Sequence, residues 1–183
     1  NKMAITYPTG CDTLLDGHVC DPCQADEHGR VRGVAFYDSD YTFTDLSDST
    51  EWDALIAANK CWVVQQTNGE YDGGSPTFTE GFGDAPQSFS SSEFKITYND
   101  PTFIGNRDFY NALNKTRDKK VAWRSETIIQ TSDVAVSVFA KSAIENDVKS
   151  KRVWNVEVTF TQADEPVQET VPAGIFDTCY NIT

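Results

Sequence analysis

The chain has few basic residues, only two histidines and no long apolar run. Against 28 Asp and Glu the sequence holds 15 Lys and Arg, which gives a net charge of −13 over 183 residues. An excess of negative charge repels phosphate groups, which argues against a protein that coats nucleic acid through phosphate neutralisation. No segment approaches the ~20 apolar residues that span a bilayer, and residues 1–4 lack the apolar core of a signal peptide. We therefore expect a globular protein without a membrane partner.

The sequence also lacks the motifs of the common catalytic classes. It contains no GxSxG, HExxH, P-loop or GxGxxG pattern, and Gly73 and Gly74 are not followed by the Lys-Ser/Thr of a phosphate-binding loop. Both histidines, His18 and His28, lie in an irregular N-terminal stretch, where a catalytic base would have no rigid support. We predict no catalytic residues and a protein that is not an enzyme.

Cysteines are concentrated near the N-terminus, where a metal site is conceivable. The residues there with metal-ligating side chains are Cys11, His18, Cys20, Cys23 and His28. Cys20 and Cys23 form a CxxC pair of the kind found in structural zinc sites. Their partners would have to be Cys11 and one histidine, which is a less typical arrangement, so free buried thiols outweigh zinc and a disulfide to Cys179 stays open. We predict no cofactor, with structural zinc as the alternative.

Turn residues and side-chain periodicity divide the chain into three parts. Residues 1–30 are rich in Pro and Gly and predict an irregular N-terminal arm, and residues 166–183 predict a C-terminal arm. Between them, residues 31–165 hold about seven or eight short strands, the clearest at 154–160, where apolar and polar side chains alternate. A passage rich in Gly, Asn and Ser at about 67–92 predicts a long loop.

Two short helices are predicted among these strands. The first begins at Thr50 and places Trp52, Leu55 and Ile56 on one face, and the second begins at an Asn106 cap. The strands after residue 119 follow one another without helices between them, which disfavours a parallel α/β fold. The expected fold class is mainly β: a β-sandwich or open barrel with one or two short flanking α-helices, a long loop and extended terminal arms.

Charges of opposite sign are gathered in two separate stretches. The acidic stretch holds Asp38, Asp40, Asp45, Asp48, Glu51 and Asp53, and the basic stretch holds Lys115, Arg117, Lys119, Lys120 and Arg124. Two such surfaces on one chain suit a head-to-tail interface between copies, whereas on charge alone they are equally consistent with solvated faces of a monomer. We expect charge reversal at Lys119 and Lys120 to weaken assembly in low salt without unfolding the subunit.

Four stretches within residues 90–178 resemble segments of a known protein family in their order along the chain and in their size. These stretches are 94–101 (FKITYNDP), 106–113 (NRDFYNAL), 121–126 (VAWRSE) and 153–160 (VWNVEVTF). Together with the acidic all-β character and the extended ends, the chain resembles small virion proteins of tailed bacteriophages, in particular tail tube proteins and related ring-forming proteins. The cysteine-containing arm at 11–23 departs from that pattern.

The resemblance implies a structural protein of the virion that assembles in the cytoplasm of the bacterial host. Its subunits would form homo-hexameric rings that stack head to tail into a hollow tube, with other virion proteins as partners and phage DNA as a passenger that does not adhere. An acidic channel repels the phosphates of that DNA. Two alternatives stay open: a capsid decoration or neck-ring protein, and a secreted or surface β-sandwich binding module that uses exposed tryptophans.

Overall fold

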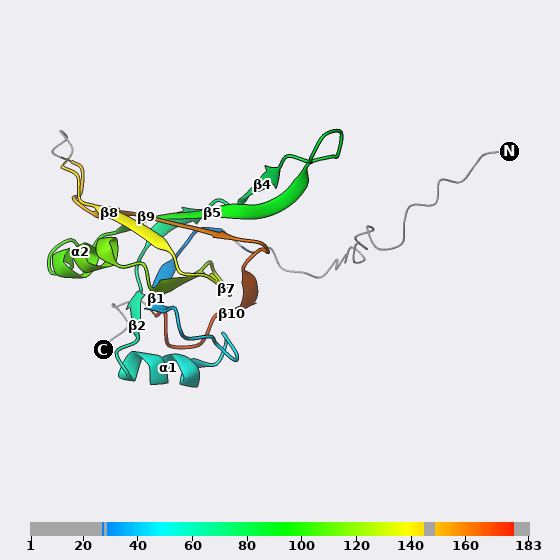
Figure 1. Ribbon diagram of the computed structural model, residues 1–183. Coiled ribbons are helices and arrows are strands. Elements are labelled where there is room, and N and C mark those ends of the chain that lie inside the picture. Colours follow the sequence, from blue (N-terminus) through cyan, green and yellow to red (C-terminus); the bar gives the residue numbers. More distant parts are fainter. Residues whose placement is uncertain (1–26, 28, 145–148, 178–183) are drawn as a thin grey trace.

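The described part of the chain forms ten β-strands and two short α-helices (Figure 1). A computed structural model describes residues 27, 29–144 and 149–177. The elements are β1 (Gly33–Asp38), α1 (Ser49–Ala57), β2 (Cys61–Val64), β3 (Asn68–Tyr71), β4 (Ser75–Thr79), β5 (Ser88–Asp100), α2 (Arg107–Lys115), β6 (Lys119–Arg124), β7 (Ile128–Thr131), β8 (Ser137–Lys141), β9 (Trp154–Gln162) and β10 (Val167–Thr170). No helix among these residues is long and apolar enough to cross a membrane.

The strands form two antiparallel sheets, which confirms the mainly-β prediction in its sandwich form. The inner sheet has the order β10-β7-β6-β1-β2, and the outer sheet has the order β3-β5-β9-β8, with β4 also paired to β5. The outer sheet buries one face only, so exposed or half-exposed side chains alternate with buried ones along β9. This alternation is the pattern from which the strand at 154–160 was predicted.

The central strands of the inner sheet, β1 and β6, are buried on both faces, and successive side chains of each strand point to opposite sides. Val34 and Phe36 of β1 pack toward the outer sheet. Ala35 and Tyr37 of the same strand pack on the other side, where α1 and residues 171–176 form a third layer (Figure 1). β1 therefore reads as a nearly continuous apolar run.

Helix α1 is attached to the inner sheet chiefly through Trp52. This side chain is fully buried, its ring centroid lies 5.6 Å from that of Phe176, and its indole N–H donates to the carbonyl of Leu46 over 2.8 Å. The helix begins one residue before the predicted Thr50, because the Asp48 carboxylate accepts from the Thr50 amide and acts as the N-cap. Trp52 and Leu55 are the buried residues of α1, whereas Ile56, predicted to share their face, is 38% exposed at its edge.

Helix α2 begins after Asn106, as predicted, and closes one end of the sandwich core. Tyr110 and Leu113 are buried between the sheets. The Asn106 side chain forms no N-cap hydrogen bond and donates instead to the Asp100 carboxylate and the Thr102 carbonyl. Near the other end of the helix, the Asn114 amide bonds both the N–H and the carbonyl of Ala140 in β8, so this edge of the outer sheet is covered.

Two passages predicted as irregular take part in the sheets. Residues 67–92, predicted as a long loop, contain β3, β4 and the start of β5, because β5 supplies hydrogen-bond partners for an otherwise polar sequence. A Cβ on Gly69 of β3 would lie 2.3 Å from the Thr97 carbonyl oxygen, so only glycine fits at this crossing. In the predicted C-terminal arm 166–183, β10 pairs with β7, and Ile175 and Phe176 are buried.

We predict that replacing Trp52 by alanine lowers the free energy of unfolding by ~3–5 kcal/mol, the usual cost of a large buried aromatic deletion. Chemical denaturation followed by tyrosine and tryptophan fluorescence measures this change. Ile56→Ala, in the same helix but on its exposed side, serves as the control and should cost less than about 1 kcal/mol. Equal losses for the two variants would contradict the assignment of Trp52 as the anchor of α1.

Candidate functional site

The most prominent surface feature is a hairpin that extends past the sandwich. Strand β9 pairs with β5 only between Ser92 and Asp100. Strand β4 pairs with the earlier part of β5, which begins at Ser88. The start of β5 therefore has β4 as its neighbour and no strand on its other side among the described residues. Figure 1 shows this β4–β5 hairpin, residues 75–93, projecting away from the body of the subunit.

The β4–β5 hairpin carries aromatic side chains that are exposed to solvent. Phe78 and Phe89 are 54% and 50% exposed and pack edge to face against each other, with ring centroids 6.2 Å apart. Phe82, in the turn, is 100% exposed. The hairpin holds three acids, including Glu80 and Asp84 beside Phe82, and no Lys or Arg. An exposed apolar group of this kind marks a surface that contacts another molecule.

A groove lies at the opposite end of β5, between β2 and the start of α2. It has a volume of about 350 Å³ and is lined by residues 62–66 of the β2 segment together with Asp100, Thr102, Asn106 and Phe109. Strand β2 is the last strand of the inner sheet on this side. The groove thus combines a sheet edge with half-buried aromatic and aliphatic side chains.

Asp100 forms the polar base of this groove and holds the α2 side of it in place. Its side chain is 3% exposed and accepts hydrogen bonds from the Thr102 amide (2.8 Å), the Asn106 amide group (3.1 Å) and the Tyr110 hydroxyl (2.7 Å). These bonds join the end of β5 to the first turn of α2. A carboxylate with three donors is well compensated for its burial.

The predicted basic residues mostly contact their own subunit. Lys119 lies 2.8 Å from Asp38, directly across the β1–β6 register, and 3.2 Å from Asp118. Partial burial opposes the charge, but the bonds to these two carboxylates raise the pKa of Lys119 above its usual value. Lys120 is 9% exposed and donates to the Tyr41 carbonyl over 2.9 Å. Charge reversal at Lys119 and Lys120 would therefore disturb the fold as well as any interface.

The remaining basic candidates differ in how exposed they are. Arg117 donates to the carbonyls of Asn114 and Thr116 at the end of α2, while Lys115 is exposed. Arg124 is half-buried, and desolvation lowers the pKa of its guanidinium below the usual value. Of this set, Lys115 and Arg117 have the exposure that an interface between copies requires.

Several of the predicted acidic residues stabilise the approach to α1. Asp48 caps the helix, and Asp45 accepts from the amide and hydroxyl of Ser47. Burial acts to raise the pKa of Glu51, but hydrogen bonds from the Tyr41 hydroxyl and from the amides of Thr44 and Asp45 lower it below its usual value. Asp40 and Asp53 are exposed.

The metal-ligand candidates Cys11, His18, Cys20, Cys23 and His28 lie outside the described residues. Within the part of the chain that the structure describes, no cluster of three or more His, Cys, Asp or Glu side chains is arranged to hold a metal ion. Cys61 is a free, buried thiol at the start of β2, and burial raises its pKa to about 12.

The tryptophans are mainly core residues, as the sequence patterns predicted. Trp52, Trp123 and Trp154 are at most 6% exposed, and Trp62 is half-buried on the wall of the β2–α2 groove. The ammonium group of Lys119 lies 5.3 Å from the centre of the Trp62 ring. Most of the aromatic area that a glycan-binding platform would use is therefore inside the subunit.

The outer face of the outer sheet is polar and shallowly hollowed. A depression of about 590 Å³ runs across β3, β5, β9 and β8, with Glu70, Thr97, Lys141 and Glu157 among its lining residues. Lys95 and Glu157 form an ion pair of 2.6 Å on this face. Phe139, 61% exposed, is the large apolar side chain here. A face with these polar and charged side chains is suited to lie against solvent.

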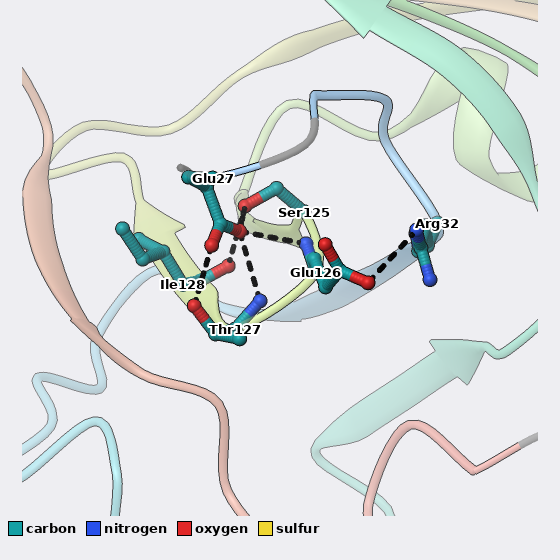
Figure 2. A network of polar contacts seen from close by, with 6 residues as sticks. All are labelled: Glu27, Arg32, Ser125, Glu126, Thr127 and Ile128. Atoms are coloured by element: carbon teal, nitrogen blue, oxygen red, sulfur yellow. Dashed lines mark hydrogen bonds and ion pairs between the residues drawn. The ribbon is translucent and has the colours of Figure 1, made fainter. Parts of the chain in front are cut away.

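Glu27 attaches the start of the described chain to the turn between β6 and β7 (Figure 2). Its carboxylate accepts from the Ser125 hydroxyl (2.6 Å), the Glu126 amide (2.8 Å) and both the amide and the hydroxyl of Thr127. The bonds from Ser125 and Thr127 lower the pKa of Glu27 to about 2. Arg32 pairs with Glu126 over 3.4 Å beside this network. Sequence reasoning missed this contact, because it joins residues nearly 100 positions apart.

No family model matches the chain, no curated protein matches it, and no solved structure matches it.

We expect the Glu27 carboxyl to titrate near its lowered pKa of about 2 rather than near the ordinary 4.5. Because the pKa is lowered by folding, the attachment is fully present above 4.5 and is lost as the pH falls through about 2. The amide chemical shift of Thr127, followed by NMR against pH, measures the midpoint.

Glu27→Ala should remove this titration and increase hydrogen exchange at the Thr127 amide. Glu126→Ala is the matched control, because it removes only the side chain that pairs with Arg32 and keeps the backbone amide that Glu27 bonds. A Thr127 midpoint near 4.5 in the parent protein, or equal exchange in both variants, would contradict the attachment.

Proposed function

We propose that this chain is a non-enzymatic structural subunit that assembles with copies of itself into rings or a hollow tube. This is the role implied by its resemblance to tail tube proteins of tailed bacteriophages. The observation that carries the proposal is the β4–β5 hairpin, which projects from the sandwich with Phe78, Phe82 and Phe89 exposed. The partners under this proposal are further copies of the chain and other proteins of the virion.

The physical argument rests on the cost of leaving the hairpin without a partner. A two-stranded ribbon is marginally stable in water by itself, and the end of this hairpin has no sheet or helix behind it among the described residues. Removing an exposed phenylalanine side chain from water contributes ~1.5–3 kcal/mol. Contact with a second subunit would both bury these rings and stabilise the ribbon.

The polar outer face of the outer sheet supports the tube form of the assembly. Four strands present Thr, Asn, Glu and Lys side chains on this face, which suits a water-filled channel. With a net charge of −13, subunits arranged around such a channel would repel the phosphates of DNA and let it pass without adhering. Homo-hexameric rings stacked head to tail are the arrangement that the resemblance implies.

Two other functions were open from the sequence. A capsid decoration or neck-ring protein would use the same fold and would form a closed oligomer or bind another virion protein instead of extending into a tube. A secreted or surface binding module is less well supported, because three of the four tryptophans that would bind a glycan are buried. No observation on the described residues favours either function over the tube subunit.

The test is negative-stain electron microscopy of the purified protein over a concentration series. We expect rings or tubes with a central channel for the parent protein, and monomers for the triple variant Phe78→Ser, Phe82→Ser, Phe89→Ser. The melting temperature of the triple variant should stay within a few degrees of the parent, because the end of the hairpin lies outside the sandwich core.

Val167→Ser is the control for the loss of an exposed apolar side chain, since Val167 is 53% exposed on β10, away from the hairpin. It should assemble like the parent. Monomers of the parent protein at every concentration would overturn the proposed function. Assembly of the triple variant at parent concentrations would show that the hairpin is not the contact.

A further inference from the structure

The turn of the β4–β5 hairpin presents one aromatic side chain, Phe82, to the solvent. Phe82 stands between Gly81 and Gly83, and its side chain is fully exposed. Gly83 has a φ of +65°, a backbone conformation that glycine adopts without strain. The phenylalanine is therefore presented at the end of a narrow turn with no bulky neighbour on either side.

The β2–α2 groove is lined by side chains that suit an inserted aromatic ring. Its walls include Trp62, Val64 and Phe109, and its base is the hydrogen-bonded Asp100. Its volume of about 350 Å³ is ample for one aromatic side chain and its flanking backbone. Because β2 ends the inner sheet on this side, an extended segment placed in the groove would run beside a sheet edge.

The hairpin and the groove lie at opposite ends of the same strand. β5 begins at Ser88, beside the hairpin turn, and ends at Asp100, in the base of the groove. Thirteen residues of strand span ~43 Å at about 3.3 Å per residue. The hairpin and α2 accordingly lie at opposite ends of the subunit in Figure 1, so the hairpin of one chain cannot enter its own groove.

Charge favours the same pairing between chains. The hairpin holds three acids and no base, whereas residues 107–117, which run from the groove along α2, hold three bases and one acid. Arg107, next to the groove, has a side chain that is 80% exposed. An acidic hairpin approaching this end of a second subunit would be attracted over distances of about the 8–10 Å Debye length.

We propose that the β4–β5 hairpin of one subunit inserts Phe82 into the β2–α2 groove of the next. The inference rests on the proposed self-assembly and names the two surfaces that perform it. The contact joins two different surfaces, so it is heterologous and generates a ring when the rotation closes and a filament or stacked tube when it does not. The groove residues Thr102 and Asn106 would border the inserted turn.

The direct test is site-specific photo-crosslinking in the full-length chain. Phe82 is replaced by the photoreactive analogue benzoylphenylalanine, assembled protein is irradiated, and the crosslinked peptides are identified by mass spectrometry. We expect crosslinks between chains from position 82 to residues 62–66 and 102–109. The same analogue at Val167 is the control and should give no crosslink to these residues.

The outcomes separate this inference from the proposed function. Rings or tubes with position 82 crosslinked to another surface would overturn the groove as the acceptor while self-assembly stands. A protein that is monomeric at every concentration and gives no crosslink between chains would overturn both. Crosslinks within a single chain to the groove would contradict the separation of the two surfaces along β5.

A second test introduces negative charge at the groove. Thr102 is exposed there, so Thr102→Glu should leave the fold intact and raise the protein concentration needed for assembly at least tenfold. Thr170→Glu, at an exposed position on β10 at the far edge of the inner sheet, is the matched control. Adding Asp84→Lys to Thr102→Glu should restore assembly, and equal assembly of both single variants would count against the groove.

Discussion

Strands β1 and β6 are covered on both faces, and the arrangement of the rest of the subunit follows from this. Their side chains alternate between two apolar layers, so one face needs the outer sheet and the other needs α1 with residues 171–176. Ala35 and Ala122 face each other across the two strands, which leaves room for Trp52 and Phe176 on that side. Removing either covering layer would expose a large part of the core to water.

Strand β5 connects this core to the surfaces proposed for assembly. Its central and C-terminal part is held between β3 and β9 and contributes Phe94, Ile96 and Tyr98 to the core. Its first residues leave the sandwich with β4, and its last residue, Asp100, bonds the start of α2. The rigid sandwich thereby sets the positions of the hairpin and the groove relative to each other, which a repeated head-to-tail contact requires.

Prediction from sequence succeeded where a signal lies within a few neighbouring residues. The alternation along β9, the start of α2 after Asn106 and the burial of Trp52 all follow from local periodicity. It failed at 67–92, where polar residues with no apolar alternation form strands because β5 pairs with them. The opposite charges of Asp38 and Lys119 were visible as well, but their pairing inside one subunit depends on β1 and β6 being neighbours.

The sequence by itself determined the class of this protein: an acidic, mainly β chain with two short helices and no recognised catalytic motif. Composition and local periodicity indicate the class because the side-chain pattern of each strand or helix reflects which of its faces is buried. Only the tertiary structure decided that Phe78, Phe82 and Phe89 stand outside the core and that residues 62–66 meet the start of α2 in a groove. Both depend on which strands pair and where each pairing ends, which is a property of contacts between residues far apart in the chain.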